Sequence, residues 1–231
     1  MRKLIKQQIK ALLQERNFEK LLNLCEENTH AWKALRFCLY ETDEEIRWAA
    51  IEATAKLMQR WWQKGKREKV REYMRNLFWS MNDESGGIGW SAPQSVAEII
   101  IHIPQLLRPY GSMMIGHALD EPPLVKSGLW GIGRLGRHLT DIIKYFQDKL
   151  LIVFQVNDTE TIGLAAWSMG EVGFTPALPF LKKLQKRRER VQIYIEGHFY
   201  EKTLGQWAKE AITKIKNTEI GLDKILLSDN I

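Results

Sequence analysis

One short peptide, residues 82–90, holds the side chains best suited to binding chemistry, and it reads NDESGGIGW. Its oxygen-bearing side chains could hold a cation, or a Lys or Arg of a partner, and its three glycines let a ligand approach the main chain. The alternative is an elaborate helix cap, in which an acidic or hydroxyl side chain accepts the free N–H groups of the next helix. Spacing alone favours the cap. The candidate binding residues are Asn82, Asp83, Glu84, Ser85 and Trp90.

A second candidate is a strip of aromatic and polar residues at helical spacing. Trp130 precedes Arg134 by four residues and Trp167 precedes Glu171 by four, so each pair lies on one helix face. If the two helices are neighbours, Arg134 lies near Glu171. One interpretation is a recognition groove, because Trp and Arg dominate interface hot spots; the other is packing between helices with a structural ion pair. The preceding helix adds Trp90, Glu98 and His102 to the strip.

Catalytic and metal-binding patterns are missing from the rest of the sequence. The five histidines never have the spacing of a helical metal pair, and the two cysteines do not form a CxxC pair. The 82–90 peptide lacks the alternating acids of an EF-hand and the Gly-Lys-Ser/Thr of a P-loop. Residues 131–136 read GxGxxG, but they follow no strand and lie within an expected helix. We therefore expect no catalytic residue, no metal and no cofactor.

The distribution of charge bears on the kind of partner. The net charge of +6 divides into +6 for residues 1–80, −4 for residues 81–180 and +4 for residues 181–231. An acidic centre disfavours the continuous basic face of a nucleic-acid-binding protein, although the basic run at 182–190 keeps that alternative open. No apolar run is long enough to span a membrane, and the basic N-terminus lacks the apolar block of a secretory signal. We expect a cytoplasmic protein with no membrane partner.

Hydrophobic periodicity predicts helices along nearly the whole chain, and comparison of the chain with itself shows five segments in phase. Their anchor residues are 42, 37, 37 and 42 positions apart. Small residues after the anchors let neighbouring helices approach closely. An Asp near the start of each of the first four segments can cap a helix, and Gly136 and Gly173 are expected helix stops. The anchors are Ile46, Ile88, Val125, Ile162 and Leu204.

One segment departs from helical spacing. Residues 191–202 alternate apolar and polar side chains, and Glu196 and Gly197 lie where a hairpin turn would be. A helix extension followed by a loop is the alternative. The alternation favours a small β-hairpin near residues 190–203, inserted before the last helix.

The segments at 43–57, 120–136 and 158–173 resemble the HEAT family, especially the short bacterial HEAT-like repeats also found in relatives of phycobilisome lyases. The likeness implies an all-α, HEAT-like α-solenoid of about five helix pairs with a concave face, forming a single domain over 1–231. An irregular helical bundle is the alternative fold. The 82–90 peptide and the strand expected around Tyr194 also resemble an uncharacterised HEAT-like family of sulfate-reducing and related anaerobic bacteria. That resemblance favours a functional loop without naming its ligand.

HEAT repeats serve many functions, so the resemblance implies no chemistry. We expect a non-catalytic binding scaffold that uses its concave face and the 82–90 loop to bind a protein partner. Nucleic-acid binding is a second hypothesis, because a family of alkylpurine DNA glycosylases uses HEAT-like repeats. Trp130, Arg134, Arg137 and Trp167 match that family's concave face in part, without a counterpart for its acidic catalytic residue. A lyase or chaperone for a tetrapyrrole cofactor is a third hypothesis, by analogy with the phycobilisome lyases.

Overall fold

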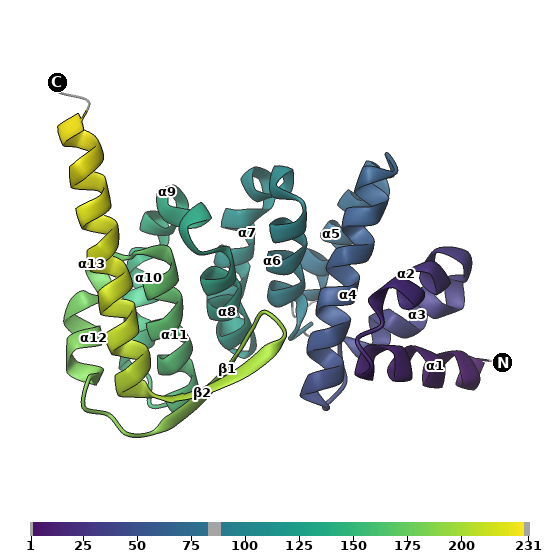
Figure 1. Cartoon of the computed structure of the whole chain (residues 1–231), viewed down its shortest axis with the longest axis horizontal. Helices are drawn as coiled ribbons and strands as arrows, with labels where there is room; N and C mark the ends of the chain where they lie inside the picture. The colour runs from purple at the N-terminus through teal and green to yellow at the C-terminus, as the bar shows by residue number, and fades with distance from the viewer. Residues whose placement is uncertain (1, 83–88, 229–231) are drawn as a thin grey trace. The chain divides into compact units, whose positions relative to one another are not determined.

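The computed structural model describes residues 2–82 and 89–228. The chain is mostly helical, as its periodicity predicts, and it divides into two compact units, Met1–Leu107 and Arg108–Ile231. Figure 1 shows the helices and the hairpin with their labels. Each unit has its own core, and the single domain expected over 1–231 stays a prediction.

Unit 1 is built from helices alone in its described part, with α4 at the centre. Helix α4 is long, and its buried residues include Trp48, Ile51, Leu57, Met58 and Trp61; the helix contacts α1, α3, α5 and α6. A helix that is apolar on several faces is expected to lie inside a bundle. The elements are α1 (Arg2–Gln14), α2 (Phe18–Glu27), α3 (Thr29–Cys38), α4 (Glu44–Gln63), α5 (Arg67–Ser80), α6 (Ala92–His102) and a 3-10 turn (Pro104–Leu106).

Two of the four predicted Asp caps are confirmed, and a third is wrong. Asp43 accepts the N–H of Ile46 at 3.2 Å, and Asp158 accepts the N–H of Thr161 at 3.0 Å. Asp120 instead ends α7, where its carboxylate pairs with Lys149. The reason is local: Pro122–Leu124 forms a 3-10 turn that precedes α8, and prolines start such a turn without needing a capped N–H. The fourth Asp, Asp83, lies outside the described residues.

Unit 2 packs around α11, which lies between α8 and α13. Residues 161–170 of α11 are buried without exception, and glycines make the close approach to its neighbours feasible. A Cβ at Gly170 would lie 2.6 Å from the Cα of Ala211 in α13. The helices are α7 (Leu107–Asp120), α8 (Val125–Leu135), α9 (Thr140–Ile143), α10 (Gln147–Ile152), α11 (Thr159–Val172), α12 (Leu178–Leu184) and α13 (Leu204–Ser228). Short 3-10 turns lie at Pro122–Leu124, Gly136–Leu139, Lys144–Phe146, Val153–Gln155 and Thr175–Ala177.

The predicted β-hairpin is confirmed. Strand β1 (Arg190–Ile195) pairs antiparallel with β2 (His198–Thr203), and Ile195 lies opposite His198 across a two-residue turn. Glu196 and Gly197 both have positive φ, 48° and 92°, as a type I′ turn requires. The predicted helix stops are also confirmed, since Gly136 and Gly173 end α8 and α11 with φ of 52° and 78°.

Two tryptophans hold the hairpin against the helices of unit 2. The indole N–H of Trp130 in α8 donates to the carbonyl of Tyr194 at 2.6 Å, and that of Trp207 in α13 donates to the carbonyl of Val191 at 3.1 Å. The side chain of Val191 fills the space that Gly163 leaves on α11. The hairpin is therefore part of the core of unit 2 and not a free appendage (Figure 1).

Candidate functional site

The 82–90 loop is described only at its ends. Asp83, Glu84 and Ser85 lie outside the described residues, so the choice between a binding loop and a cap stays open. The N–H of Gly89 donates to the carbonyl of Ser80 at 2.6 Å, which brings the two ends of the peptide together beside the C-terminus of α5. Asn82 is partly exposed, and Trp90 presents 52% of its surface to solvent.

Glu98 and His102 meet inside unit 1 and do not line an open face. Glu98 is only 5% exposed, and its Oε1 lies 3.7 Å from Nδ1 of His102, one helical turn further along α6. Gln59 of α4 donates to the carbonyl of His102 at 3.1 Å. The main chain of His102 therefore contributes to the contact between α4 and α6, whereas Trp90 is exposed.

The predicted aromatic groove is a packed core in unit 2. Trp130 and Trp167 are brought together, with ring centroids 6.5 Å apart, but they are only 3% and 5% exposed. A Cβ at Gly133 would overlap the Trp167 ring, so the ring fills the space above that glycine. Burial thus supports the packing interpretation over the recognition groove for these two side chains.

The predicted pairing of Arg134 with Glu171 is replaced by two other ion pairs. Arg134 Nη1 lies 3.2 Å from Oε1 of Glu196 at the hairpin turn, and Glu171 pairs with Lys214 of α13. Neither partner lies in α8 or α11. The hairpin brings a carboxylate to Arg134, and α13 brings an ammonium to Glu171, so each is neutralised by an element outside that helix pair.

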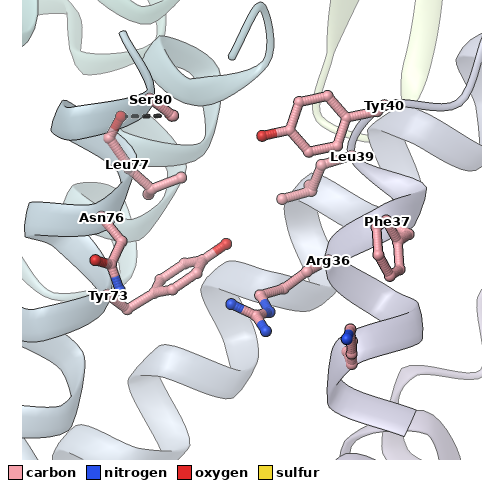
Figure 2. Close-up of a pocket in the computed structure, with 9 residues that line it drawn as sticks. Arg36, Phe37, Leu39, Tyr40, Tyr73, Asn76, Leu77 and Ser80 are labelled. Atoms are coloured by element: carbon pink, nitrogen blue, oxygen red, sulfur yellow. Dashed lines mark hydrogen bonds between the residues drawn. The ribbon is translucent and has the colours of Figure 1, made fainter. Parts of the chain in front are cut away.

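A different site lies in unit 1, between α3 and α5 (Figure 2). A pocket of about 280 Å³ separates the two helices. On each side the lining follows one helix face, with spacing i, i+3, i+4 and i+7. The residues are Lys33, Arg36, Phe37 and Tyr40, with Leu39, on the α3 side, and Tyr73, Asn76, Leu77 and Ser80 on the α5 side.

The opposite face of α3 explains why this stripe stays open. Ala31, Leu35 and Cys38 are buried against unit 1, and Asn28 caps the helix by accepting the N–H of His30 at 2.9 Å. The helix is thus fixed by one face and its N-terminus. Phe37 and Tyr40, on the other face, remain 56% and 48% exposed.

The pocket is basic and contains no carboxylate among its lining residues. Among the described residues, neither Lys33 nor Arg36 is paired with an acid. Nζ of Lys33 lies 6.0 Å from the centroid of the Phe37 ring, and Cζ of Arg36 lies 5.4 Å from the centroid of the Trp32 ring. Figure 2 shows Arg36 and Tyr40 extending from the α3 side toward α5, and Tyr73 extending from α5 toward α3. The two walls therefore direct polar groups into one space.

Tyr73 is the most unusual residue of the pocket. It is only 7% exposed, and its hydroxyl has no hydrogen-bond partner within the described part of the chain. Burial raises the pKa of the Tyr73 phenol well above its usual range, and the nearby positive charge of Arg36 opposes that shift. In the described part of the chain, the fold therefore uses the ring of Tyr73 and leaves its buried hydroxyl without a partner.

Two further hollows adjoin the pocket, and the three together are called the α3 groove below. One hollow, of about 310 Å³, is lined by Lys6, His30, Lys33, Ala34 and Phe37. The other, of about 180 Å³, is lined by Trp32, Arg36, Trp61, Lys69, Glu72, Tyr73 and Asn76. Each hollow shares lining residues with the central pocket, and basic and aromatic side chains of α3 line all three. Glu72 is the single acid among these lining residues.

Sequence reasoning missed this groove, although one signal was present. Lys33, Arg36, Phe37 and Tyr40 form a basic and aromatic stripe at helical spacing. The matching stripe on α5 begins with Tyr73. The spacing of residues in the sequence does not show that this side chain is buried.

Comparisons with known proteins give a distant relative and no family. No protein-family model matches the chain. It is similar to an uncharacterized protein of Archaeoglobus fulgidus, with 27% identity over 157 residues, covering 68% of this chain and 81% of that protein. That similarity carries no activity.

The described residues contain neither a cluster suited to a metal ion nor a helix suited to spanning a membrane. In that part of the chain, no group of three or more His, Cys, Asp or Glu could hold a metal ion. None of its helices has both the length and the apolar character needed to cross a membrane.

Proposed function

We propose that the protein is a non-catalytic binding protein, and that the α3 groove binds an acidic segment of a protein partner. The observation that carries the proposal is the pair of cations, Lys33 and Arg36, in a groove where neither has a carboxylate partner among the described residues. An acidic segment supplies the charge that is missing. Exposed aromatic side chains beside basic ones are typical of interaction surfaces.

The aromatic residues of the groove suit a polypeptide. Phe37 and Tyr40 are exposed next to Lys33 and Arg36, so a bound segment can bury apolar area while its acids face the cations. Trp79 is also exposed, 61% of its surface, next to Ser80 at the end of α5. The two cysteines of unit 1 offer no nucleophile, because burial raises the pKa of Cys25 to about 12 and that of Cys38 to about 11.

The finer architecture is part of the proposal. We propose that the helices stack as HEAT-like repeats, as the sequence resemblance implies. The support is the succession of neighbouring helices α8, α11 and α13, joined through small residues, with Gly136 and Gly173 ending two of them. The 82–90 loop stays a candidate contact, because Gly89 within it donates to the carbonyl of Ser80, which lines the groove.

Burial of two tryptophans weighs against the DNA-glycosylase and tetrapyrrole hypotheses. Both drew in part on Trp130 and Trp167 as groove residues, and these side chains are buried. Nucleic-acid binding in general remains as an outcome of the binding test. It predicts a steep loss of affinity with salt.

The proposal predicts the effect of removing two charges. Lys33→Gln/Arg36→Gln is expected to weaken binding of a labelled Glu-rich peptide about tenfold, since both cations would face its carboxylates. Fluorescence anisotropy with the full chain, in low and in high salt, measures the affinity. A single-stranded DNA oligonucleotide of equal charge is titrated in parallel.

A matched control separates the groove from net charge. Lys186→Gln/Arg188→Gln removes the same two residue types from an exposed segment of unit 2. Equal loss in both double variants, or no binding of the peptide to wild type, would contradict the proposal. Tighter binding of the oligonucleotide than of the peptide would replace the protein partner with a nucleic acid.

A further inference from the structure

The unpartnered hydroxyl of Tyr73 indicates a more specific role within the α3 groove. Buried hydroxyls are nearly always hydrogen-bonded, since leaving one without a partner costs stability. Phenylalanine would fill the same space without that cost. Tyr73 packs edge-on against Trp32, with ring centroids 5.2 Å apart, so the ring alone serves the core. In the described part of the chain, the oxygen is the part that the fold does not use.

Arg36 and Tyr40 of the α3 side lie near this hydroxyl, and Asn76 lines the same pocket. Arg36 reaches across from the α3 side and is close enough for its charge to lower the pKa of Tyr73 against the larger effect of burial. Asn76 lies one helical turn beyond Tyr73 on the same wall and adds a carboxamide. Ser80 already donates to the carbonyl of Leu77 at 2.7 Å, so its hydrogen is committed (Figure 2).

This end of the groove favours an anionic ligand over a cationic one, although Glu72 also lines it. The aromatic faces that could hold an ammonium group are already covered by the chain's own cations. Lys69 Nζ lies 3.4 Å from the centroid of the Trp61 ring, and the guanidinium of Arg36 lies over Trp32. A further positive charge would meet Lys69 and Arg36 directly.

We infer that Arg36 and Tyr73 form an oxyanion site in the α3 groove, with Asn76 as a third donor. The site takes a carboxylate or a phosphate carried by the bound segment. The guanidinium fork matches the paired oxygens of either group, and the phenol donates a hydrogen bond to the same anion. This inference rests on the proposed function, because the bound segment brings the anion.

The test removes one oxygen and leaves the charge of the groove intact. Tyr73→Phe is expected to weaken binding of the Glu-rich peptide about tenfold, because a hydrogen bond from a buried donor to a charged group is lost. Binding of the matching Gln-rich peptide should be unchanged. A third peptide, with phosphoserine in place of one Glu, distinguishes the two sources of the anion. The peptide whose affinity falls more in Tyr73→Phe carries the anion that the site binds. Tyr145→Phe, at an exposed tyrosine of unit 2, is the control.

A second readout distinguishes a binding role from a structural one. Without peptide, Tyr73→Phe is expected to raise the melting temperature by about 2–4 °C, because an unpartnered buried hydroxyl is removed. If the hydroxyl stabilised the fold, Tyr73→Phe would lower the melting temperature instead. If Tyr73→Phe leaves the affinity for both anionic peptides unchanged while Lys33→Gln/Arg36→Gln weakens it, the inference fails and the proposed function stands. If no peptide binds to wild type, both fail.

Discussion

Trp130→Ala is expected to destabilise unit 2 by about 3–5 kcal/mol, the usual cost of truncating a fully packed tryptophan. Trp130 is 3% exposed, contacts the Trp167 ring and holds the carbonyl of Tyr194 through its indole N–H. The substitution leaves a cavity and also leaves that carbonyl without its indole donor. Thermal and urea unfolding of the full chain measure the loss, and hydrogen exchange of β1 amides reports release of the hairpin.

The matched control for this truncation is an exposed tryptophan. Trp79→Ala removes the same side chain where 61% of it faces solvent, and is expected to change stability by less than about 0.5 kcal/mol. The prediction would be wrong if the two variants unfolded alike. Trp130→Phe keeps an aromatic ring but removes the indole N–H with the pyrrole half of the ring, with an expected cost of about 1–3 kcal/mol.

Gly170→Ala is the second substitution with a large expected effect. In an ordinary helix alanine is favoured over glycine by about 1 kcal/mol. Here the new Cβ would lie 2.6 Å from the Cα and 2.8 Å from the Cβ of Ala211, so α11 and α13 must move apart. Overpacking of this kind costs about 1–3 kcal/mol beyond the helical preference. Chemical denaturation at equilibrium gives the difference in the free energy of unfolding.

Gly116→Ala is the control for the second prediction. Gly116 also lies within a helix of unit 2, but a Cβ added there would meet its nearest neighbour, the Phe146 ring, at 3.6 Å, which is an ordinary contact. This variant is expected to be as stable as wild type or more stable, by up to about 1 kcal/mol. The prediction would be wrong if Gly116→Ala lowered the free energy of unfolding, or if Gly170→Ala left it unchanged. Close helix packing would then not explain the effect of adding a Cβ in unit 2.

Local features of the fold were accessible from the sequence where a residue acts on its own neighbours. Asp43 and Asp158 cap their helices, Gly136 and Gly173 end theirs, and Gly197 closes the predicted hairpin. Each of these depends on backbone geometry within a few residues. The failure at Asp120 has the same local origin, because the two prolines that follow it set the start of α8.

The candidate site was less accessible, because it depends on which elements meet. The spacing of Trp130 and Trp167 places each on one helix face with its polar neighbour, but no spacing tells whether that face is covered. The hairpin contacts Trp130, and the hairpin and α13 supply Glu196 and Lys214 as ion-pair partners. In unit 1, a site arises where the sequence did not predict one. Helices α3 and α5 are separated by α4 in sequence, and the pocket exists because they face each other.

The central claim is that the α3 groove is the binding surface, and amide chemical shifts of the isotope-labelled full chain test it most directly. The Glu-rich peptide is titrated into the protein, and the residues whose shifts move are mapped. The proposal predicts changes concentrated in residues 30–40 and 69–80, which line the groove. Changes concentrated in the basic segment at 182–190, or no changes at a saturating peptide concentration, would contradict it.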